Sequence, residues 1–229
     1  MGVVATGKQR SERRADALSK ERIVETAIEI LDTEGENALT FRALAARLAT
    51  GAGAIYWHVA NKNDLLTAAT EAVVARALTE GDDAAEPRQA IRDIALGVFD
   101  AIDAHPWVGT QLTREPWQAA MLSIFEGLGG RLPALGVPEP AQFDAASALL
   151  NYVLGVAGQN AANAREHARA TDRRAFLGAV AARWSALDPR RYPFLNRAAE
   201  RLPDHDDREQ FLAGIDLILA GIETLGGPA

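Results

Sequence analysis

Cysteine is absent from the 229 residues of this chain, and its apolar runs are short. The absence of cysteine excludes disulfide bonds and thiolate-ligated metal sites, although it leaves the cellular compartment open. The two longest apolar stretches, residues 145–157 and 211–222, are interrupted by Asn151 and Asp216. Neither reaches the roughly 20 residues that span a bilayer, and the N-terminus has no apolar core of a signal peptide. We therefore expect a cytoplasmic protein without a membrane segment.

Motifs that mark enzymes are also missing. The four histidines are scattered, and the sequence contains no HExxH pair, nucleophile elbow, Walker loop or GxGxxG fingerprint. His105, which precedes Pro106, is more typical of a loop or pocket residue than of a catalytic base. We therefore do not expect an enzyme, and we expect no cofactor.

Negative charge is in excess, but it is unevenly distributed. The net charge is −7, yet residues 1–62 hold nine Lys or Arg against eight Asp or Glu, whereas acidic residues outnumber basic ones by eight in the remainder. Residues 40–62 contain three Lys or Arg and no carboxylate at all. Such a window can approach a polyphosphate without repulsion. It predicts contact with nucleic acid there, although the chain as a whole is acidic.

Apolar residues recur with helical spacing through most of the chain, and no segment alternates as a strand does. Ser19 is placed to cap the first helix and Gly35 to end it, and Asn61 is placed to cap a helix that continues to Thr79. Further helices are expected after Pro87 and at about 141–168, 172–186 and 211–225, with connections at 131–140 and 189–193. We therefore predict an all-α fold.

The segment from residue 40 to residue 58 has the proportions of a helix-turn-helix. Thr40 caps a short helix, a turn follows at Thr50 and Gly51, and another short helix runs to about His58. Alanine and glycine dominate the segment, and such small side chains let two helices cross closely. In a helix-turn-helix the first helix rests on the DNA backbone and the second enters the major groove.

Side chains expected to point outward from this segment can bind phosphate and base edges. Arg42 can bind guanine bidentately or hold a phosphate, and five further groups can donate to phosphate oxygens, namely Thr40, Tyr56, Trp57, His58 and Lys62. Taken alone, each has a structural alternative, with Tyr56 and Trp57 as core aromatics and Arg42 as a surface cation. Together they favour DNA binding over a purely structural helical adaptor, which would not retard short duplexes in a gel.

The run from Leu39 to Leu66, LTFRALAARLATGAGAIYWHVANKNDLL, resembles the DNA-binding module of the tetracycline-repressor family. Its Tyr-Trp-His-Val motif is more similar to the tetracycline repressors themselves than to the wider family. The resemblance implies a homodimeric transcriptional regulator, in the first place a repressor. Its two reading helices would enter successive major grooves of a palindromic double-stranded operator, and a small-molecule effector would release it.

The resemblance also implies that Arg42 reads bases and that Tyr56 and His58 contact DNA from the end of the recognition helix. The sequence departs from the family at Ala52 and Gly53, where tetracycline repressors carry larger base-reading residues. Readout is therefore expected to depend on Arg42, thymine methyl contacts and DNA shape. The expected DNA-binding residues are Thr40, Arg42, Ala52, Gly53, Ala54, Tyr56, Trp57, His58 and Lys62. The resemblance implies that Lys62 holds a phosphate.

We predict a flexible basic tail at residues 1–18, a helix-turn-helix domain at 19–64, and a helical domain at 65–229 that binds the effector and dimerises. Small residues follow one side of the helix expected from residue 141, at Ala148, Asn151, Gly155, Gly158 and Ala162. The last helix has an apolar stripe at Phe211, Ile215, Ile218, Ile222 and Leu225. Mid-helix glycines cost about 1 kcal/mol each relative to alanine, which close helix approach would offset. We expect a homodimer through about 145–162 and 211–225; packing of the same faces within one chain is the alternative.

Aromatic and polar residues of the larger domain are candidates to line an effector cavity, although each could equally belong to the core. The candidates are Phe99, Trp107, Thr110, Trp117, Phe125, Tyr152 and Gln159, with Trp184 as a further aromatic. The stretch from Trp107 to Thr110 is similar to the metal-binding segment of the tetracycline repressors, but a tryptophan replaces the expected histidine ligand. Gln159 stands near the position of their acidic ligand. Neither side chain can bind Mg²⁺ in that way, so we expect a more apolar effector and no metal.

Overall fold

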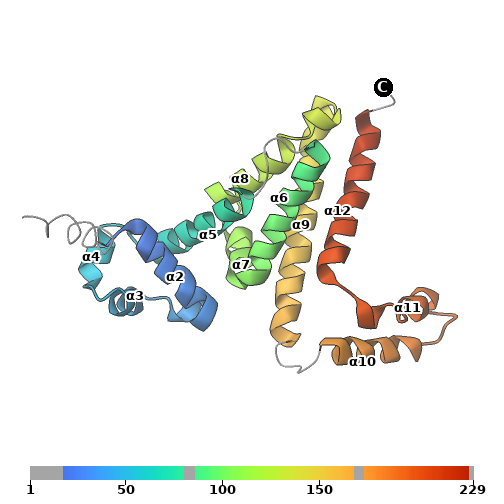
Figure 1. Ribbon diagram of the computed structural model, residues 1–229, viewed down its shortest axis with the longest axis horizontal. Coiled ribbons are helices and arrows are strands. Elements are labelled where there is room, and N and C mark those ends of the chain that lie inside the picture. Colours follow the sequence, from blue (N-terminus) through green and yellow to red (C-terminus); the bar gives the residue numbers. More distant parts are fainter. Residues whose placement is uncertain (1–17, 80–85, 168–172, 227–229) are drawn as a thin grey trace, which may run out of the picture. The chain divides into compact units, whose positions relative to one another are not determined.

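The computed structural model describes residues 18–79, 86–167 and 173–226, and Figure 1 shows that most of them are helical. No strand occurs in these ranges, and the predicted all-α fold is confirmed. The chain divides into two compact units, residues 1–73 and 74–229, which are described separately. The predicted tail, residues 1–18, lies outside the described residues except for its last residue. The predicted domain limits at 19–64 and 65–229 stay a prediction.

The described part of the N-terminal unit is built from short capped helices. Its elements are α2 (Lys20–Glu34), η1 (Glu36–Ala38), α3 (Phe41–Arg47), α4 (Ala52–Tyr56) and the first part of α5 (Lys62–Thr79). The side chains of Ser19, Thr40 and Asn61 accept hydrogen bonds at 3.2, 3.1 and 3.0 Å from backbone N–H groups three residues ahead, as the sequence predicts. Gly35 ends α2 with φ 80° and ψ 174°, a region that only glycine adopts readily.

Apolar side chains from all four helices meet in the core of this unit. The fully buried ones include Ile23, Ala27, Leu44, Ile55 and Leu65. Burying a large aliphatic side chain stabilises a fold by about 1.5–3 kcal/mol. Helices of five to seven residues, such as α3 and α4, would not be stable alone, so this shared core holds them in place.

The turn between α3 and α4 is a Schellman motif with an alanine where glycine is usual. The N–H of Thr50 donates to the carbonyl of Ala45 at 2.9 Å, and the N–H of Ala49 donates to that of Ala46 at 3.4 Å. Ala49 has φ 50°, in the left-handed region. An L side chain costs about 1–2 kcal/mol there, so the turn carries backbone strain.

The C-terminal unit contains the remaining helices. They are α6 (Pro87–Ala104), α7 (Pro106–Arg114), α8 (Ala119–Gly129), η2 (Pro133–Leu135), α9 (Glu139–His167), α10 (Arg173–Ser185), α11 (Pro193–Ala198), η3 (Leu202–Asp204), α12 (Asp207–Glu223) and η4 (Thr224–Gly226). The connections predicted at 131–140 and 189–193 contain more helix than expected, because η2 and the start of α9 lie in the first and α11 begins at the end of the second. Proline suits the first turn of a helix, where its missing N–H would be unpaired, so these prolines start helices as well as interrupt them.

The long helix α9 lies at the centre of this unit, in contact with α6, α7, α8 and α12 (Figure 1). Phe211 of α12 lies between Phe99 of α6 and Tyr152 of α9, with ring centroids 4.5 and 5.6 Å away. The Tyr152 hydroxyl donates to the carbonyl of Phe211 at 3.2 Å. A Cβ atom at Gly214 would lie only 1.8 Å from that hydroxyl oxygen. A glycine on α12 therefore makes room for the tyrosine of α9.

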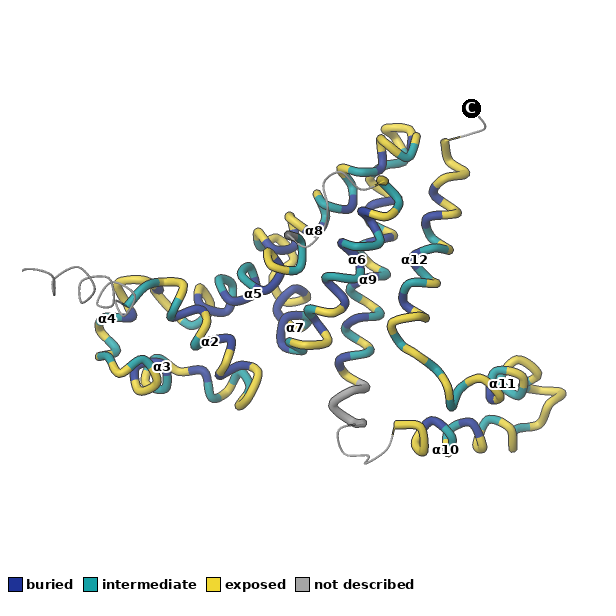
Figure 2. Tube along the Cα trace, in the orientation of Figure 1, coloured by how far each residue is buried: buried dark blue, intermediate teal, exposed yellow. Residues whose placement is uncertain are grey.

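The buried stripe of α12 differs from the predicted one. Its buried members are Phe211, Ile215, Leu219 and Ile222, whereas Ile218 is only half-buried and Leu225 is exposed. The stripe named from the sequence was assigned to a dimer interface, and that assignment stays a prediction. Ile218 and Leu219 are adjacent and both apolar, so the sequence pattern fits either phase of the helix. Figure 2 shows the resulting alternation of buried and exposed residues along α12.

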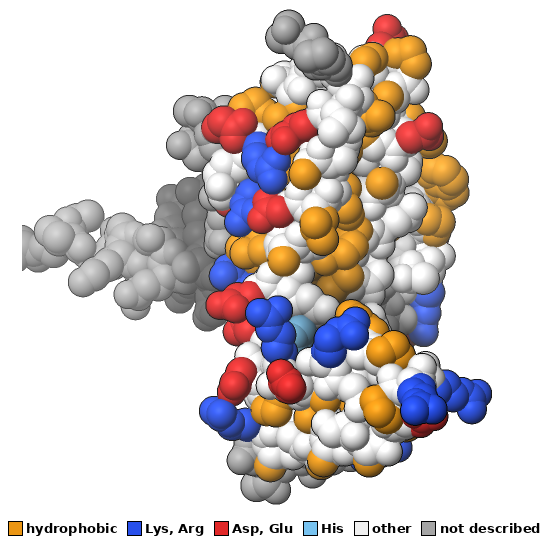
Figure 3. Space-filling view, turned by 90° about the vertical axis from the view of Figure 1, so that its right-hand side faces the viewer, with side chains coloured by type: hydrophobic (Ala, Val, Ile, Leu, Met, Phe, Trp, Pro, Cys, Tyr) orange, Lys and Arg blue, Asp and Glu red, His pale blue; other side chains and the backbone are white. Residues whose placement is uncertain are grey.

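Ion pairs join α12 to α6. Arg88 contacts Glu223 at 2.6 Å and Asp216 at 3.2 Å, and Arg92 also pairs with Asp216. Figure 3 views the side that carries α12 and shows charged side chains gathered along one edge of it. The hydrogen bond from Arg92 holds the pKa of Asp216 below its ordinary value of 3.8, and Arg88 acts in the same direction.

The helices were compared with the requirements of a membrane-spanning segment. Among the described residues, none of the helices combines the length and hydropathy that a transmembrane span requires.

Asp216→Asn is expected to destabilise the protein at neutral pH and to lose this effect in acid. The folded pKa lies below the unfolded value, so the carboxylate stabilises the fold above about pH 4, and this stabilisation is lost as the pH falls through the folded pKa. Urea unfolding at about pH 7 and about pH 2.5 measures the difference. Asp144→Asn removes an exposed carboxylate that makes no ion pair with a described residue and should have little effect at either pH. An equal loss at both pH values for Asp216→Asn would contradict the assignment.

Ala49→Gly is expected to raise the free energy of unfolding by about 0.5–1 kcal/mol. The substitution removes the Cβ penalty at φ 50°, and the greater freedom of glycine in the unfolded chain offsets part of the gain. Urea unfolding at one protein concentration tests it, with Ala46→Gly in α3 as the matched control. That control should destabilise by about 1 kcal/mol, because glycine is a poor helix former. If Ala49→Gly were equally destabilising, the turn would not be strained.

Candidate nucleic-acid interface and ligand cavities

The residues predicted to face DNA gather on α3, α4 and their flanks. Six of them are exposed, namely Thr40, Arg42, Gly53, Tyr56, Trp57 and His58, while Ala52 and Ala54 are half-buried. Trp57 is 90% exposed and Tyr56 55% exposed, so neither is a core aromatic. Ile55 and Val59, which the same stretch contributes to the core, are buried. The segment thus divides cleanly into inward aliphatic and outward polar and aromatic side chains.

Arg42 is an available cation. Its side chain is exposed, and it makes no ion pair within the part of the chain that the structure describes. It lies two residues after the Thr40 cap, in the first turn of α3. A guanidinium in this setting presents its full set of donors to solvent, which suits a base edge or a phosphate.

The ring of Tyr56 is held by a neighbour that sequence reasoning missed. Phe41, the first residue of α3, stacks on Tyr56 with ring centroids 4.4 Å apart and planes at 5°. Phe41 is half-buried, so it joins the core of the unit to the exposed Tyr56 ring. The only signal in the sequence was an aromatic residue directly after the Thr40 cap. We assign Phe41 to positioning Tyr56 rather than to contact with a ligand.

Two cations of the carboxylate-free window have partners inside the unit. The Nζ of Lys62 donates to the carbonyl of Glu36 at 2.6 Å and ties the start of α5 to η1. Arg47 pairs with Glu34 and lies 4.0 Å from Glu29, both on α2. The window is carboxylate-free along the chain but not in space, because α2 supplies these partners.

The residues predicted to line an effector cavity do not converge. Phe99, Thr110 and Gln159 border three different cavities, of about 300, 350 and 350 Å³. Trp107 is buried and Trp117 is 84% exposed. Phe125 packs edge-on against Phe143, and Tyr152 belongs to the aromatic stack with Phe99. Their role in effector binding stays a prediction.

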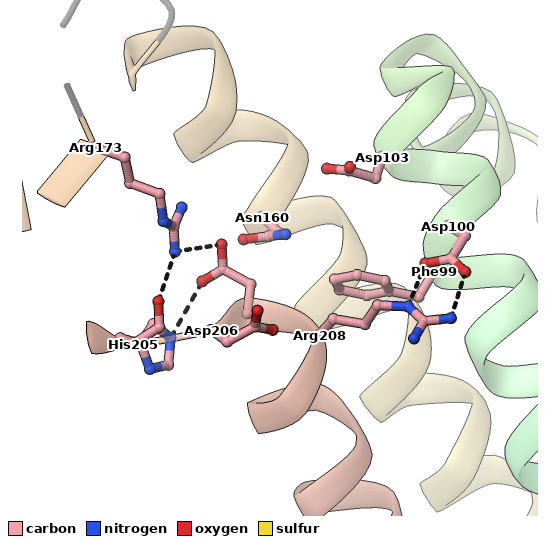
Figure 4. Close-up of a pocket in the computed structure, with 9 residues that line it drawn as sticks. Phe99, Asp100, Asp103, Asn160, Arg173, His205, Asp206 and Arg208 are labelled. Atoms are coloured by element: carbon pink, nitrogen blue, oxygen red, sulfur yellow. Dashed lines mark hydrogen bonds and ion pairs between the residues drawn. The ribbon is translucent and has the colours of Figure 1, made fainter. Parts of the chain in front are cut away.

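The 300 Å³ cavity is polar and lies where α6, α9, α10 and the start of α12 meet (Figure 4). Its basic side chains are engaged with carboxylates: Arg173 with Asp207 at 2.7 Å, His205 with Asp207 at 3.1 Å, and Arg208 with Asp100 at 3.2 Å. The network fastens α10 and α12 to each other and α12 to α6. Across the described residues, no group of three or more His, Cys, Asp or Glu side chains is arranged to hold a metal ion.

Two family models match this chain. The tetracyclin repressor-like C-terminal domain matches residues 83–225, and the tetR family of bacterial regulatory proteins matches residues 23–69. An HTH-type transcriptional regulator of Saccharopolyspora erythraea is 29% identical over 155 residues, which are 67% of this chain and 66% of that protein. The class C tetracycline repressor of Escherichia coli is 44% identical over 57 residues, which are 25% of this chain and 26% of that protein.

Solved structures extend the similarity to more than nine-tenths of the chain. A TetR transcriptional regulator of Streptomyces coelicolor is 54% identical with a TM-score of 0.84, and the match covers 91% of this chain and 99% of that one. ActR of the same organism, solved in complex with actinorhodin, is 24% identical with a TM-score of 0.71, over 93% of this chain and all of that one, and shares the fold. With a family model that spans most of its length and a relative more than half identical, this chain belongs to the tetracycline-repressor (TetR) family of transcriptional regulators.

Proposed function

We propose that this regulator binds a palindromic operator as a homodimer through α3 and α4, in the first place as a repressor, and that a small-molecule effector releases it. The helix-turn-helix domain, residues 19–64, would bind DNA, and residues 65–229 would dimerise and bind the effector. The observation that carries the proposal is the exposed group of donors and aromatics around α4, led by Arg42 and the 90% exposed Trp57. Burial of so exposed a ring against a partner would stabilise the complex.

In this proposal α4 enters the major groove and α3 lies across the DNA backbone. Arg42 reads a base edge, while Tyr56 and His58 donate to phosphate or base groups at the far end of α4. Ala52, Gly53 and Ala54 offer no side-chain hydrogen bonds. They let the backbone approach closely and leave the remaining readout to methyl contacts and DNA shape.

Lys62 can hold a phosphate without releasing its internal partner. An ammonium group has three donors, and the contact with the carbonyl of Glu36 occupies one of them. The carbonyl also restricts the flexible lysine side chain before DNA arrives, so less side-chain entropy would be lost on binding.

Arg42→Ala is expected to relax sequence preference. Affinity for a duplex selected from a random pool should fall by about 1–3 kcal/mol, while affinity for an unrelated duplex changes less, because the bidentate contact is lost only at the specific site. Fluorescence anisotropy at one salt concentration compares the two duplexes. Arg183→Ala on α10 removes the same charge from another exposed arginine and should change neither affinity. Equal losses on both duplexes would make Arg42 a phosphate contact instead.

The dimer proposal rests on exposed faces of α9 and α12. Exposed residues on α9 recur every three or four positions and include Ala148, Asn151, Gly155, Gln159 and Ala162, and those on α12 include Ala213, Leu217, Ala220 and Gly221. Nothing in the described chain lies within 4 Å of a Cβ built at Gly155, Gly158 or Gly221. Figure 3 shows hydrophobic side chains along the middle of the side that carries α12. Packing among the described residues therefore does not account for these glycines, whereas close approach of a second copy would.

Gly155→Leu is expected to weaken the dimer and leave the chain folded. The open space around Gly155 accommodates the side chain in one subunit, but two-fold symmetry repeats the obstruction across the interface, which costs about 2–6 kcal/mol of dimerisation free energy. Sedimentation velocity over a range of concentrations measures the dissociation constant. Gly178→Leu, a helical glycine of α10 that also faces open space, is the control and should remain dimeric. A Gly155→Leu protein that dimerises normally would contradict this interface.

For the effector, the complex of ActR with actinorhodin supports a small molecule bound by the same fold. We propose a largely apolar or aromatic effector that favours one spacing of the two reading heads over another and lowers DNA affinity by a coupling free energy of about 1–3 kcal/mol. We propose that α5 transmits the change, because this one helix, Lys62–Thr79, begins in the N-terminal unit and ends in the C-terminal unit. A Cβ at Gly97 of α6 would lie 2.6 Å from the carbonyl oxygen of Ala77, so the end of α5 contacts the α6 backbone directly.

A further inference from the structure

A cavity of about 590 Å³ lies between the α10–α11 segment and the start of α12. Trp184, Phe194 and Leu202 give it an apolar lining, and Arg197 and Arg201 lie at its border. The cavity shares lining residues with the neighbouring cavity of about 350 Å³, among them Trp184 and Leu202, so the two spaces adjoin. Volumes of about 300–1,000 Å³ are typical of small-molecule sites.

The walls of this cavity are fixed by the chain itself. The side-chain amide nitrogen of Asn196 on α11 lies 3.3 Å from the carbonyl oxygens of Trp184 and Leu187 and 3.2 Å from that of Tyr192. These contacts hold α11 against the end of α10. His205, which also lines the cavity, is held by Asp207, and Asp207 in turn binds Arg173. The cavity is thus bordered by elements that hydrogen bonds and ion pairs already position.

The charged groups that line this cavity include two arginines. No carboxylate occurs among its lining residues. Arg197 and Arg201 are four residues apart and exposed, and neither forms an ion pair with any residue in the described ranges. This sets them apart from Arg88, Arg173 and Arg208, each of which is paired with a carboxylate of the same unit. Two such guanidinium groups beside an aromatic lining are complementary to an anion with an apolar body.

We propose that this cavity binds an organic acid with an aromatic body. The rings of the ligand pack against Trp184 and Phe194, and its acid group binds Arg197 and Arg201, because guanidinium groups form paired hydrogen bonds with carboxylates and with tetrahedral oxyanions such as phosphates. This site differs from the effector site predicted from the sequence. Of the residues named for that site, Trp184 borders this cavity, and the sequence analysis gave it only as a further aromatic. Binding here does not depend on the proposed function, whereas any effect on DNA rests on it.

The full-length chain is titrated with the aromatic sulfonate 1-anilinonaphthalene-8-sulfonate and, separately, with the neutral N-phenyl-1-naphthylamine, which has the same rings without the acid. Saturable binding of the sulfonate is expected, with energy transfer from Trp184 that makes the transfer in the wild type larger than in Trp184→Phe. The double variant Arg197→Gln and Arg201→Gln should bind the sulfonate about tenfold more weakly, because it loses charge-assisted hydrogen bonds. It should bind the neutral amine as the wild type does, which also reports that the variant is folded.

The matched control is Arg183→Gln with Arg190→Gln, two exposed arginines of the same region that do not border the cavity. This control should bind the sulfonate within about twofold of the wild type, and the charge-retaining pair Arg197→Lys with Arg201→Lys should recover most of the affinity. The proposal is overturned by equal losses in both glutamine pairs, by no loss in the first pair, or by the absence of saturable binding to the dimeric protein. The last result would mean that a second copy fills the cavity.

The link to DNA is measured separately, by gel retardation of a selected duplex with and without the sulfonate. Release of the duplex that the first glutamine pair abolishes supports a role of the cavity in regulation. Binding of the sulfonate without release supports the cavity and contradicts its coupling to DNA. Failure of the protein to retain any duplex contradicts the proposed function and leaves the binding result intact.

Discussion

The packing of the C-terminal unit depends on the burial of one face of α9. Ala145, Leu149, Val153 and Ala157 follow one another along this helix and contact the core to which α6, α7, α8 and α12 contribute. The opposite face carries small and exposed residues and has no neighbour in the described chain near its two glycines. Because one rigid helix supplies both faces, the core that stabilises the subunit also decides where a second subunit would meet it.

Charge is used differently in the two units. In the C-terminal unit four carboxylates of α6 and α12 pair with arginines, namely Asp100, Asp207, Asp216 and Glu223, and Asp216 receives both Arg88 and Arg92. In the N-terminal unit Arg47 and Lys62 have internal partners, and Arg42 is left to solvent. The overall negative charge therefore says little about what the surface of α3 and α4 can bind, and the placement of individual cations decides it.

Local signals were predicted well from the sequence. The caps at Ser19, Thr40 and Asn61 and the stop at Gly35 act within three or four residues, so their outcome is fixed by nearby chain chemistry. The prediction that Ile55 faces the core while its neighbours Tyr56 and Trp57 face outward succeeded for the same reason. The family motif also lies within one short run of residues.

Features that depend on distant residues were not predicted. The partner of Lys62 is a backbone carbonyl of η1, and the partner of Arg47 is a carboxylate of α2. The spacing of apolar residues along the sequence does not indicate such contacts. Leu219 rather than Ile218 is buried where Phe211 packs against Phe99 and Tyr152, and the sequence pattern does not report these ring contacts. The short helices that begin at prolines were not predicted. The cavity beside Trp184 was not predicted either, because it depends on how α10, α11 and η3 are arranged in space.

The fit of Tyr152 beside Gly214 has a consequence for assembly. The Tyr152 phenol of α9 occupies the space that a side chain at position 214 of α12 would fill. It therefore restricts both the sliding and the rotation of α12 against α9. Sliding α12 by one turn would drive the ring into a residue that has a Cβ atom. The exposed faces of α9 and α12 therefore keep a constant alignment with each other. A second subunit that bound both faces would meet an arrangement that the half-buried Tyr152, beneath that surface, helps to set.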